Sequence, residues 1–441
     1  MNEQQPKSSA AALLPLLAFL CIFIGAGVYL TMTGTDMAFY QLSATVAILP
    51  AIALALMQGK ERLNKKISIF LSGVGEINIM TMCMIFLLAG GFASVAKSIG
   101  AVSATVNFGL SFAPSQCILP GLFVIAAFVS TAMGTSMGTV AAITPIALGV
   151  AGQTSIPLPL IMGVVLGGAM FGDNLSMISD TTIASTRTQG CDMGDKFRMN
   201  LLIALPAALA VILLLWISGT SGTDVTVQDY NVILVIPYLS VIVLALLGIN
   251  VFVVLAVGIV LSGFIGLACT PGYTWLKWGQ DIYAGFTGMH EIFVLSMLIG
   301  GLGELIKYRG GIAWILERIE ALSARLAQGK STRAGECCIA MLVALADICT
   351  ANNTVAIILT GGMAREIAGK HGIDPRRSAS VLDTVSCIMQ GLLPYAAQLL
   401  LAGSMAKLSP MSIAANNWYC MLLAVAVLGS IIVGRPGAPR R

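Results

Sequence analysis

Acidic, hydroxyl and amide side chains interrupt the long apolar stretches of this chain. One interruption, residues 172–182, carries Asp173 and Asp180 among glycine, serine and threonine residues. Such residues unwind a helix, and irregular backbone is tolerated in a membrane only where it lines a cavity or is buried in protein. The freed carbonyls, hydroxyls and carboxylates are oxygen ligands, which hard cations prefer. The pattern therefore indicates a binding site for a cation or a proton.

Three further segments have the same polar composition. Residues 131–139 and 347–354 are the predicted tips of two helical hairpins, and residues 383–394 are a second predicted break. Within these segments we predict that sodium binds at Asp173, Asp180 and Asp383. The full set of candidate ligands for a cation or a proton is Asp173, Asp180, Asn174, Ser176, Ser179, Thr181, Thr135, Ser136, Thr139, Asp347, Asn352, Asn353, Thr354, Asp383 and Thr384.

The charges inside these stretches are predicted to be acidic only. Glu76 and Glu291 join the four aspartates, and the nearest basic residue is taken to be Arg187. Because each ionised carboxylate costs about 2.5–3.5 kcal/mol at mid-membrane, each must be protonated, bound to a cation or capped by a helix N-terminus. Glu76 and Glu291 are expected either to cap helices at a hinge or to act directly in coupling. Asp180 and Asp383 can cap half-helices as well as bind an ion.

The composition defines the class of protein. Of the 441 residues, 57% are hydrophobic and 10% are charged, whereas a soluble domain has about 25% charged residues. This pattern excludes a disordered chain and predicts an all-α polytopic membrane protein, because the apolar runs exceed the length of barrel strands. The scattered basic residues exclude a nucleic-acid surface. No ATPase signature is present, so we predict a secondary transporter that is not an enzyme, has no cofactor and uses ion gradients.

The apolar runs predict about ten transmembrane helices plus two re-entrant hairpins, at residues 114–151 and 334–364. Cytoplasmic N- and C-termini leave only Lys97, Lys277 and Lys407 outside, so 24 − 3 = 21 basic residues lie inside. That distribution follows the positive-inside rule.

The two halves of the chain repeat each other weakly. A shift of 215 residues aligns residues 73–77 with 288–292, and a shift of 203 aligns Asp180 with Asp383. Because the first copy starts inside and the second outside, we predict two inverted repeats with discontinuous helices that meet at the midplane. Residues 1–219 hold the outside-opening hairpin and a broken helix at 157–186. Residues 220–441 hold the inside-opening hairpin and a broken helix at 378–404.

Several of these motifs resemble one family. Residues 172–182 resemble a signature of the NhaC family of sodium/proton antiporters, and residues 135–139 are similar to its Gly-Thr-Ser hairpin tip. Residues 382–384 with Pro394 are a looser match. The resemblance implies an elevator-type antiporter of the wider ion-transporter superfamily, in the bacterial cytoplasmic (inner) membrane. Asn174 stands where many relatives have a lysine, which removes a positive charge beside Asp173 and puts the ion count or the substrate in question.

The alternative prediction is a sodium-coupled transporter of a small organic acid or amino acid, because the family also resembles exchangers of organic acids. A carboxylate solute would need hydrogen-bond donors, which here are half-helix N-termini and the amides of Asn352 and Asn353. The expected partners are sodium, protons and the lipid bilayer. The alternative function adds a small organic solute, and the assembly that we consider is a homodimer. A receptor is disfavoured because no signalling domain is evident.

Overall fold

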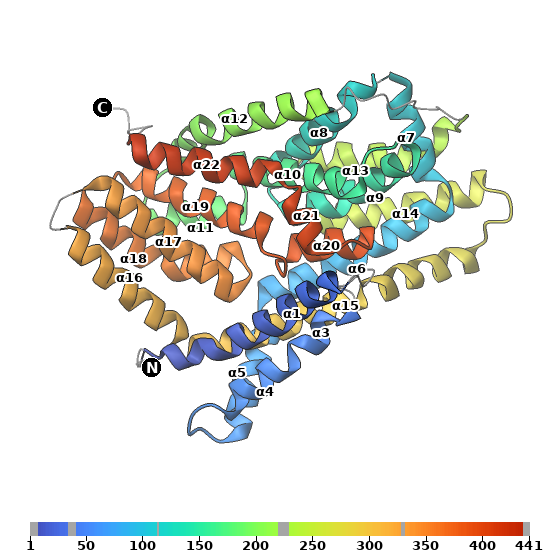
Figure 1. Ribbon diagram of the computed structural model, residues 1–441. Helices are drawn as coiled ribbons and strands as arrows, with labels where there is room; N and C mark the ends of the chain where they lie inside the picture. Colours follow the sequence, from blue (N-terminus) through green and yellow to red (C-terminus); the bar gives the residue numbers. More distant parts are fainter. Residues whose placement is uncertain (1–7, 34–40, 113, 219–228, 328–330, 435–441) are drawn as a thin grey trace.

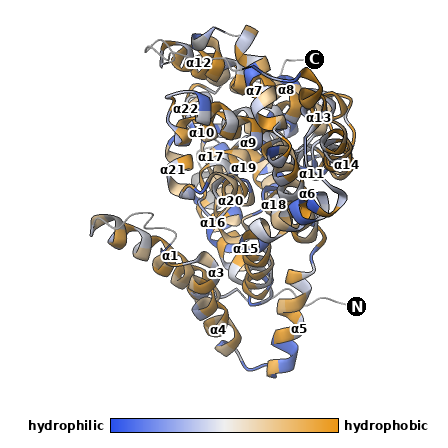
Figure 2. Ribbon diagram, turned by 90° about the vertical axis from the view of Figure 1, so that its right-hand side faces the viewer, coloured by the Kyte–Doolittle hydropathy of each residue, from blue (hydrophilic) through white to orange (hydrophobic). Residues whose placement is uncertain are grey.

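The computed structural model describes residues 8–33, 41–112, 114–218, 229–327 and 331–434, and within them all regular structure is helical. Eight helices of this described part are long and apolar enough to cross a membrane, and shorter apolar helices accompany them. Hydrophobic residues predominate along most of the helices (Figure 2). The predicted multi-pass, all-helical class is therefore confirmed, whereas the predicted count of spans stays a prediction.

The first half of the chain supplies the hairpin and the broken helix predicted there. Its helices are α1 (Leu14–Met32), α3 (Ala44–Ala47), α4 (Leu49–Met57), α5 (Leu63–Val74), α6 (Ile77–Ser98), α7 (Ala101–Phe112), α8 (Ile118–Met133), α9 (Ser136–Gln153), α10 (Leu158–Leu175), α11 (Asp180–Gln189) and α12 (Met193–Ser218). Helices α8 and α9 form the hairpin, and α10 and α11 are the two parts of the broken helix. Residues 176–179 separate these two parts.

The second half also contains a helical hairpin followed by a broken helix. Its helices are α13 (Ile236–Leu246), α14 (Val251–Cys269), α15 (Trp275–Tyr308), α16 (Gly311–Ala327), α17 (Thr332–Thr350), α18 (Asn353–His371), α19 (Pro375–Leu392), α20 (Ala397–Ala406), α21 (Pro410–Ala415) and α22 (Trp418–Val433). Helices α17 and α18 form the second hairpin, and α19 and α20 the second broken helix. Helix α15 is continuous where α5 and α6 are separated at Gly75 and Glu76.

The helix boundaries give a register for the repeat. Helices α9, α10 and α11 begin 217 residues before α18, α19 and α20, as in 375 − 158 = 217. This register pairs Asp173 with Gln390 and leaves Asp383 opposite Leu166, so it differs from the 203-residue shift predicted for that part. The two tips also correspond, because Gly134 and Ala351 are both left-handed (φ 69° and 50°). The inverted orientation of the two repeats stays a prediction. The predicted boundary between them, at residues 219–220, lies outside the described residues.

One part of the second break is corrected by the structure. The break was predicted to begin at Asp383, but Asp383 and Thr384 lie within the continuous helix α19, and residues 393–396 form the gap. The Thr384 hydroxyl donates to the carbonyl of Ser380 one turn back (2.7 Å). The Oδ2 atom of Asp383 is bound by the side chains of Lys196 and Asn200 on α12, so α19 remains continuous around it.

Two groups of helices meet around the site (Figure 1). Helix α15 packs lengthwise and antiparallel against α6, with Gly285 against Gly90, and against α5, with Gly300 against Gly73. A Cβ atom on Gly285 would lie 2.3 Å from the carbonyl oxygen of Gly90, so only glycine permits this approach. The hairpins and the broken helices, with α12 and α22, form the second group.

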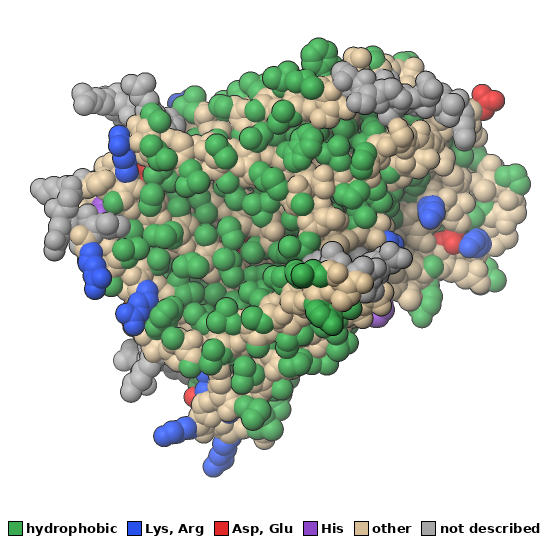
Figure 3. Space-filling view, in the orientation of Figure 1, with side chains coloured by type: hydrophobic (Ala, Val, Ile, Leu, Met, Phe, Trp, Pro, Cys, Tyr) green, Lys and Arg blue, Asp and Glu red, His purple; other side chains and the backbone are tan. Residues whose placement is uncertain are grey.

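Charged side chains gather at the ends of the molecule. Figure 3 shows lysine and arginine concentrated on the left, with a broad hydrophobic surface between them and a few charges on the right. The first helix begins and the last helix ends on that left-hand side in Figure 1. Residues 219–228 and 435–441 lie outside the described residues.

Candidate functional site

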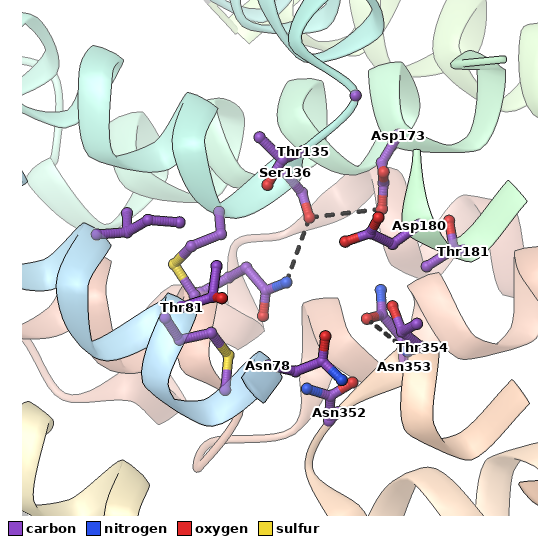
Figure 4. A pocket seen from close by; sticks show the side chains of 15 residues that line it. Asn78, Thr81, Thr135, Ser136, Asp173, Asp180, Thr181, Asn352, Asn353 and Thr354 are labelled. Atoms are coloured by element: carbon purple, nitrogen blue, oxygen red, sulfur yellow. Dashed lines mark hydrogen bonds between the residues drawn. The ribbon is translucent and has the colours of Figure 1, made fainter. Parts of the chain in front are cut away.

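A pocket lies where the two hairpin tips, the first helix break and the start of α6 come together (Figure 4). It encloses about 90 Å³, room for several water molecules at about 10–15 Å³ each. Among the described residues, none that lines it is basic. The lining residues are Asn78, Thr81, Met82, Ile85, Gly134, Thr135, Ser136, Met137, Asp173, Asp180, Thr181, Asn352, Asn353, Thr354 and Gln398.

Asp173 is the buried acid of this pocket. Its side chain is only 3% exposed and lies in the last turn of α10. Its Oδ2 atom has two long contacts, from the Ser136 hydroxyl at 3.5 Å and the Cys387 thiol at 3.7 Å. Gln398 donates to the same Ser136 hydroxyl at 3.2 Å, so a chain of polar groups links α20, α9 and α10. The carboxylate thus keeps acceptor capacity for a proton or an ion.

The backbone around the pocket favours negative charge. Helices α9, α11 and α18 all begin at its wall, after the caps Thr135, Ser179 and Asn352, whose side chains accept from backbone N–H groups of the first turn. Helix N-termini carry partial positive charge. Three of them compensate for ionised Asp173 and Asp180, beside which the described part of the wall has no basic side chain. Asp180 itself is exposed to the pocket from the first turn of α11.

More than half of the predicted ligands line this pocket, and they come from both halves of the chain. They are Asp173, Asp180, Thr181, Thr135, Ser136, Asn352, Asn353 and Thr354. The rest lie outside it. Ser176 and Ser179 shape the break, the Thr139 hydroxyl donates to the carbonyl of Thr135 at 3.0 Å, and Thr384 bonds within its own helix.

Asp347 is held away from the pocket lining in the second half. It is fully buried in α17, where the Gln390 amide donates to its Oδ1 atom at 2.9 Å. Its Oδ2 atom has no hydrogen-bond partner among the described residues. In the 217-residue register Gln390 is the counterpart of Asp173, so the partner of Asp347 in the second broken helix stands where the first broken helix has its own buried acid.

The prediction that no basic residue lies among the acids is wrong. Lys196, in the first turn of α12, is fully buried and its Nζ atom lies 2.8 Å from Oδ2 of Asp383. The same ammonium donates to the carbonyl of Asn174 (3.1 Å) and the hydroxyl of Thr182 (2.6 Å). A positive charge therefore lies against the backbone of Asn174, although the residue itself is neutral. Asp383, predicted with Asp173 and Asp180 as a sodium ligand, is instead paired with this lysine.

The two glutamates differ in role. Glu76 caps α6, because its carboxylate accepts from the backbone N–H groups of Asn78 (2.8 Å) and Ile79 (3.1 Å). Glu291 lies inside the continuous helix α15, where it accepts a hydrogen bond of 2.5 Å from the Ser43 hydroxyl. It lines a separate cavity with His290 and Lys407. The two positions are therefore not equivalent caps, since only the first repeat breaks its helix there.

Three polar residues near the site were not predicted as ligands. Asn78 lines the pocket from the first turn of α6, and Gln398 does so from α20. Asn200 lies one turn after Lys196 and donates to both Asp383 (2.7 Å) and the Asn174 carbonyl (2.9 Å). The four-residue spacing of Lys196 and Asn200 at the start of an apolar helix is the signal that could have revealed them.

The donor set suits a monovalent ion in transit more than a resident transition metal. The described residues contain no group of three or more His, Cys, Asp and Glu side chains placed to hold a metal. The pocket offers two carboxylates with hydroxyl and amide oxygens, which are hard ligands. A cation bound there would be the cargo.

Comparison with known proteins agrees with this chemistry. The sequence profile of the Na+/H+ antiporter family matches residues 7–220. An Na+/H+ antiporter NhaC of Bacillus subtilis is 25% identical over 346 residues, which cover 72% of this chain and 75% of the relative. The chain is a relative of the NhaC sodium/proton antiporters. The predicted resemblance is thus confirmed, and the similarity is to transporters of sodium and protons.

Two further similarities extend over nearly the whole chain. A malate-2H+/Na+-lactate antiporter of Bacillus subtilis is 25% identical over 454 residues, which cover 94% of each protein. The solved structure of the Alcanivorax borkumensis YdaH transporter covers 98% of this chain and 100% of its own, at 13% identity and a TM-score of 0.43.

Proposed function

We propose that this protein is a secondary antiporter that exchanges sodium for protons at the pocket between the two hairpin tips. The observation that carries the proposal is the oxygen-rich pocket around Asp173 and Asp180, with no basic residue in its described lining. Sodium binds the ionised carboxylates, and a proton replaces it on the return. Competition of the two cations for one acid couples their movements in opposite directions.

The size of the pocket supports a small cargo in this conformation. About 90 Å³ holds an ion with a few waters, since one water needs about 10–15 Å³. Hydroxyl oxygens of Thr135, Ser136 and Thr181 and amide oxygens of Asn352 and Asn353 surround the acids. They would replace part of the hydration shell of the ion.

We infer that access to the pocket alternates between two faces. Asn352 also lines a second cavity, together with Glu76 and Lys307, on the predicted inner side. A larger cavity of about 670 Å³ has Lys97 and Lys407 in its wall, on the predicted outer side. An elevator movement of the hairpins and broken helices past α6 and α15 would join the pocket to each cavity in turn. We propose the bacterial inner membrane as the location of the protein, with both termini in the cytoplasm.

Sodium-dependent proton flux in proteoliposomes tests the proposal. Asp173→Asn and Asp180→Asn keep the shape of the side chains but cannot exchange a proton for a cation, so each should abolish or strongly reduce the flux. Asp192→Asn makes the same change at an exposed residue outside the pocket and should leave the flux unchanged. Normal exchange by both pocket variants would move the search to Asp347.

A second candidate function is the sodium-coupled exchange of a small organic acid. The 94% coverage of the malate-2H+/Na+-lactate antiporter favours it. The amides of Asn78, Asn353 and Gln398 and the helix N-termini could donate to a carboxylate in the pocket. Uptake of labelled malate or lactate into the same proteoliposomes, driven by sodium and blocked by Asp173→Asn, would favour this candidate over simple antiport.

A further inference from the structure

A second cluster of oxygen atoms lies behind the pocket, and it is occupied by a side chain. It is formed by the end of α10, the start of α11 and the middle of α19, and the Lys196 ammonium lies at its centre. Three oxygens accept from the ammonium at 2.6–3.1 Å: Oδ2 of Asp383, the carbonyl of Asn174 and the hydroxyl of Thr182. An ammonium has three N–H donors, so every donor has a partner.

The position of the ammonium is one that suits a free cation. The Asn174 carbonyl belongs to the last turn of a half-helix, where backbone carbonyls carry partial negative charge. In discontinuous membrane helices such carbonyl ends coordinate transported cations. Asp383 adds a full negative charge, and neither it nor Lys196 is exposed. The cluster thus has the ligands of a dehydrated cation site, with the cation supplied by the chain.

Three more oxygens, on side chains of residues that are bonded within this cluster, have no hydrogen-bond partner among the described residues. They are Oδ1 of Asn174, Oδ1 of Asn200 and Oδ1 of Asp383, all buried. Buried polar atoms are almost always satisfied, so three unsatisfied acceptors on the residues of one cluster call for an explanation. A cation site provides more oxygen acceptors than there are N–H and O–H donors around it, whereas a simple ion pair does not need such an excess.

We propose that the Lys196 ammonium is a built-in cation at a second cation site formed by Asp383, Asn174 and Thr182. Its presence leaves the Asp173 pocket as the one place where a free alkali ion binds in this region. Removing the ammonium while keeping Asp383 opens the second site to sodium. The inference deepens the proposed function and rests on it only in treating sodium as the transported ion.

Binding of ²²Na+ to the purified full-length protein in detergent tests this assignment. The wild-type protein should bind about one ion per chain and Lys196→Ala about two, so melting temperature should rise about twice as steeply with log sodium concentration in the variant. Lys196→Ala with Asp383→Asn removes the charge of the second site and should return to one ion. Lys277→Ala removes another ion-paired lysine, 2.8 Å from Asp281, and should also bind one.

Each outcome decides the matter. An equal number of ions bound by Lys196→Ala and by the double variant would overturn the assignment. If Lys196→Ala is poorly folded, its yield of monodisperse protein should recover in sodium chloride but not in choline chloride, and an equally low yield in both would also overturn it. Failure of the wild-type protein to bind sodium would instead refute the proposed function. The difference in the number of ions bound by the two variants would still test the second site.

Discussion

Replacing Gly172 by alanine should disturb both the stability of the protein and its affinity for sodium. A Cβ atom on Gly172 would lie 2.3 Å from the carbonyl oxygen of Ala127 and 2.5 Å from Cβ of Ser130, both on α8. Since ordinary contacts begin near 3.4 Å, α10 must move away from α8 by about 1 Å. Overpacking of this kind costs about 1–3 kcal/mol of stability.

The same movement shifts Asp173, the next residue. Withdrawing one carboxylate oxygen from about 2.4 to about 3.4 Å from a sodium ion loses about 2 kcal/mol at an effective dielectric constant of about 20. At about 1.36 kcal/mol per factor of ten, the sodium affinity should fall about thirtyfold. Sodium titrations and thermal melting of the purified variant measure both effects.

Gly121→Ala is the matched control, because it adds the same methyl group to α8 where a Cβ atom would have no neighbour within 4 Å. It should melt no earlier than the wild-type protein and bind sodium equally well. A Gly172→Ala protein that is destabilised but binds sodium with wild-type affinity would refute the role of Asp173 as a ligand. Wild-type stability would refute the close packing of α8 on α10.

Two further predictions concern residues outside the pocket. Glu76→Ala removes the carboxylate that caps α6 by accepting hydrogen bonds from the backbone N–H groups of Asn78 (2.8 Å) and Ile79 (3.1 Å). The variant should lose about 1 kcal/mol of unfolding free energy, measured by thermal melting. Glu76→Gln should reduce sodium-dependent proton flux far less than Asp173→Asn does, and an equal loss of flux would give Glu76 a direct coupling role. Arg377→Met leaves Glu336, now 2.7 Å away and buried, without its partner and should cost about 3–5 kcal/mol. Adding Glu336→Leu should restore most of that stability, and no restoration would contradict the account of the pair.

The hairpin tips and the first helix break could be predicted because few structures suit their residues. Glycine, serine, threonine and asparagine within apolar runs unwind a membrane helix, and a polar backbone there needs a cavity. Residues 131–139, 172–182 and 347–354 fit this rule, and the structure brings them to one pocket. Asp173 and Asp180 followed from the same rule, because they are acids inside such a segment.

Lys196 could not be predicted by that rule. A lysine near the end of an apolar run is normally placed in water, and it was counted among the basic residues of the inner side. In the structure the chain turns sharply at Gly190 (φ 72°), which folds the first turn of α12 back against the helix break. The long aliphatic arm of the lysine then carries its charge to Asp383.

The register of the repeat was difficult to predict from sequence for a related reason. Asp180 and Asp383 are both followed by threonine, so sequence alone favoured pairing them. The helix boundaries pair Asp173 with Gln390 instead, since α10 and α19 begin and end at equivalent positions. The acids are not distributed symmetrically between the halves. Lys196 compensates Asp383, whereas none of the described residues that line the pocket of Asp173 is basic.

The central claim is that sodium and protons compete for the carboxylates of one pocket, and sodium titrations of the purified protein across pH test it most directly. If one proton is displaced by each ion, the apparent sodium affinity should weaken tenfold for each pH unit below the pH at which the site titrates, or about 1.36 kcal/mol per unit. Above that pH the affinity should level off, and Asp173→Asn should remove the dependence together with most of the binding. Exchange near neutral pH requires the site to titrate between about pH 6 and about pH 9, within the range documented for buried acids. A sodium affinity that is constant from about pH 5.5 to about pH 9 would therefore contradict competitive exchange at Asp173 and Asp180.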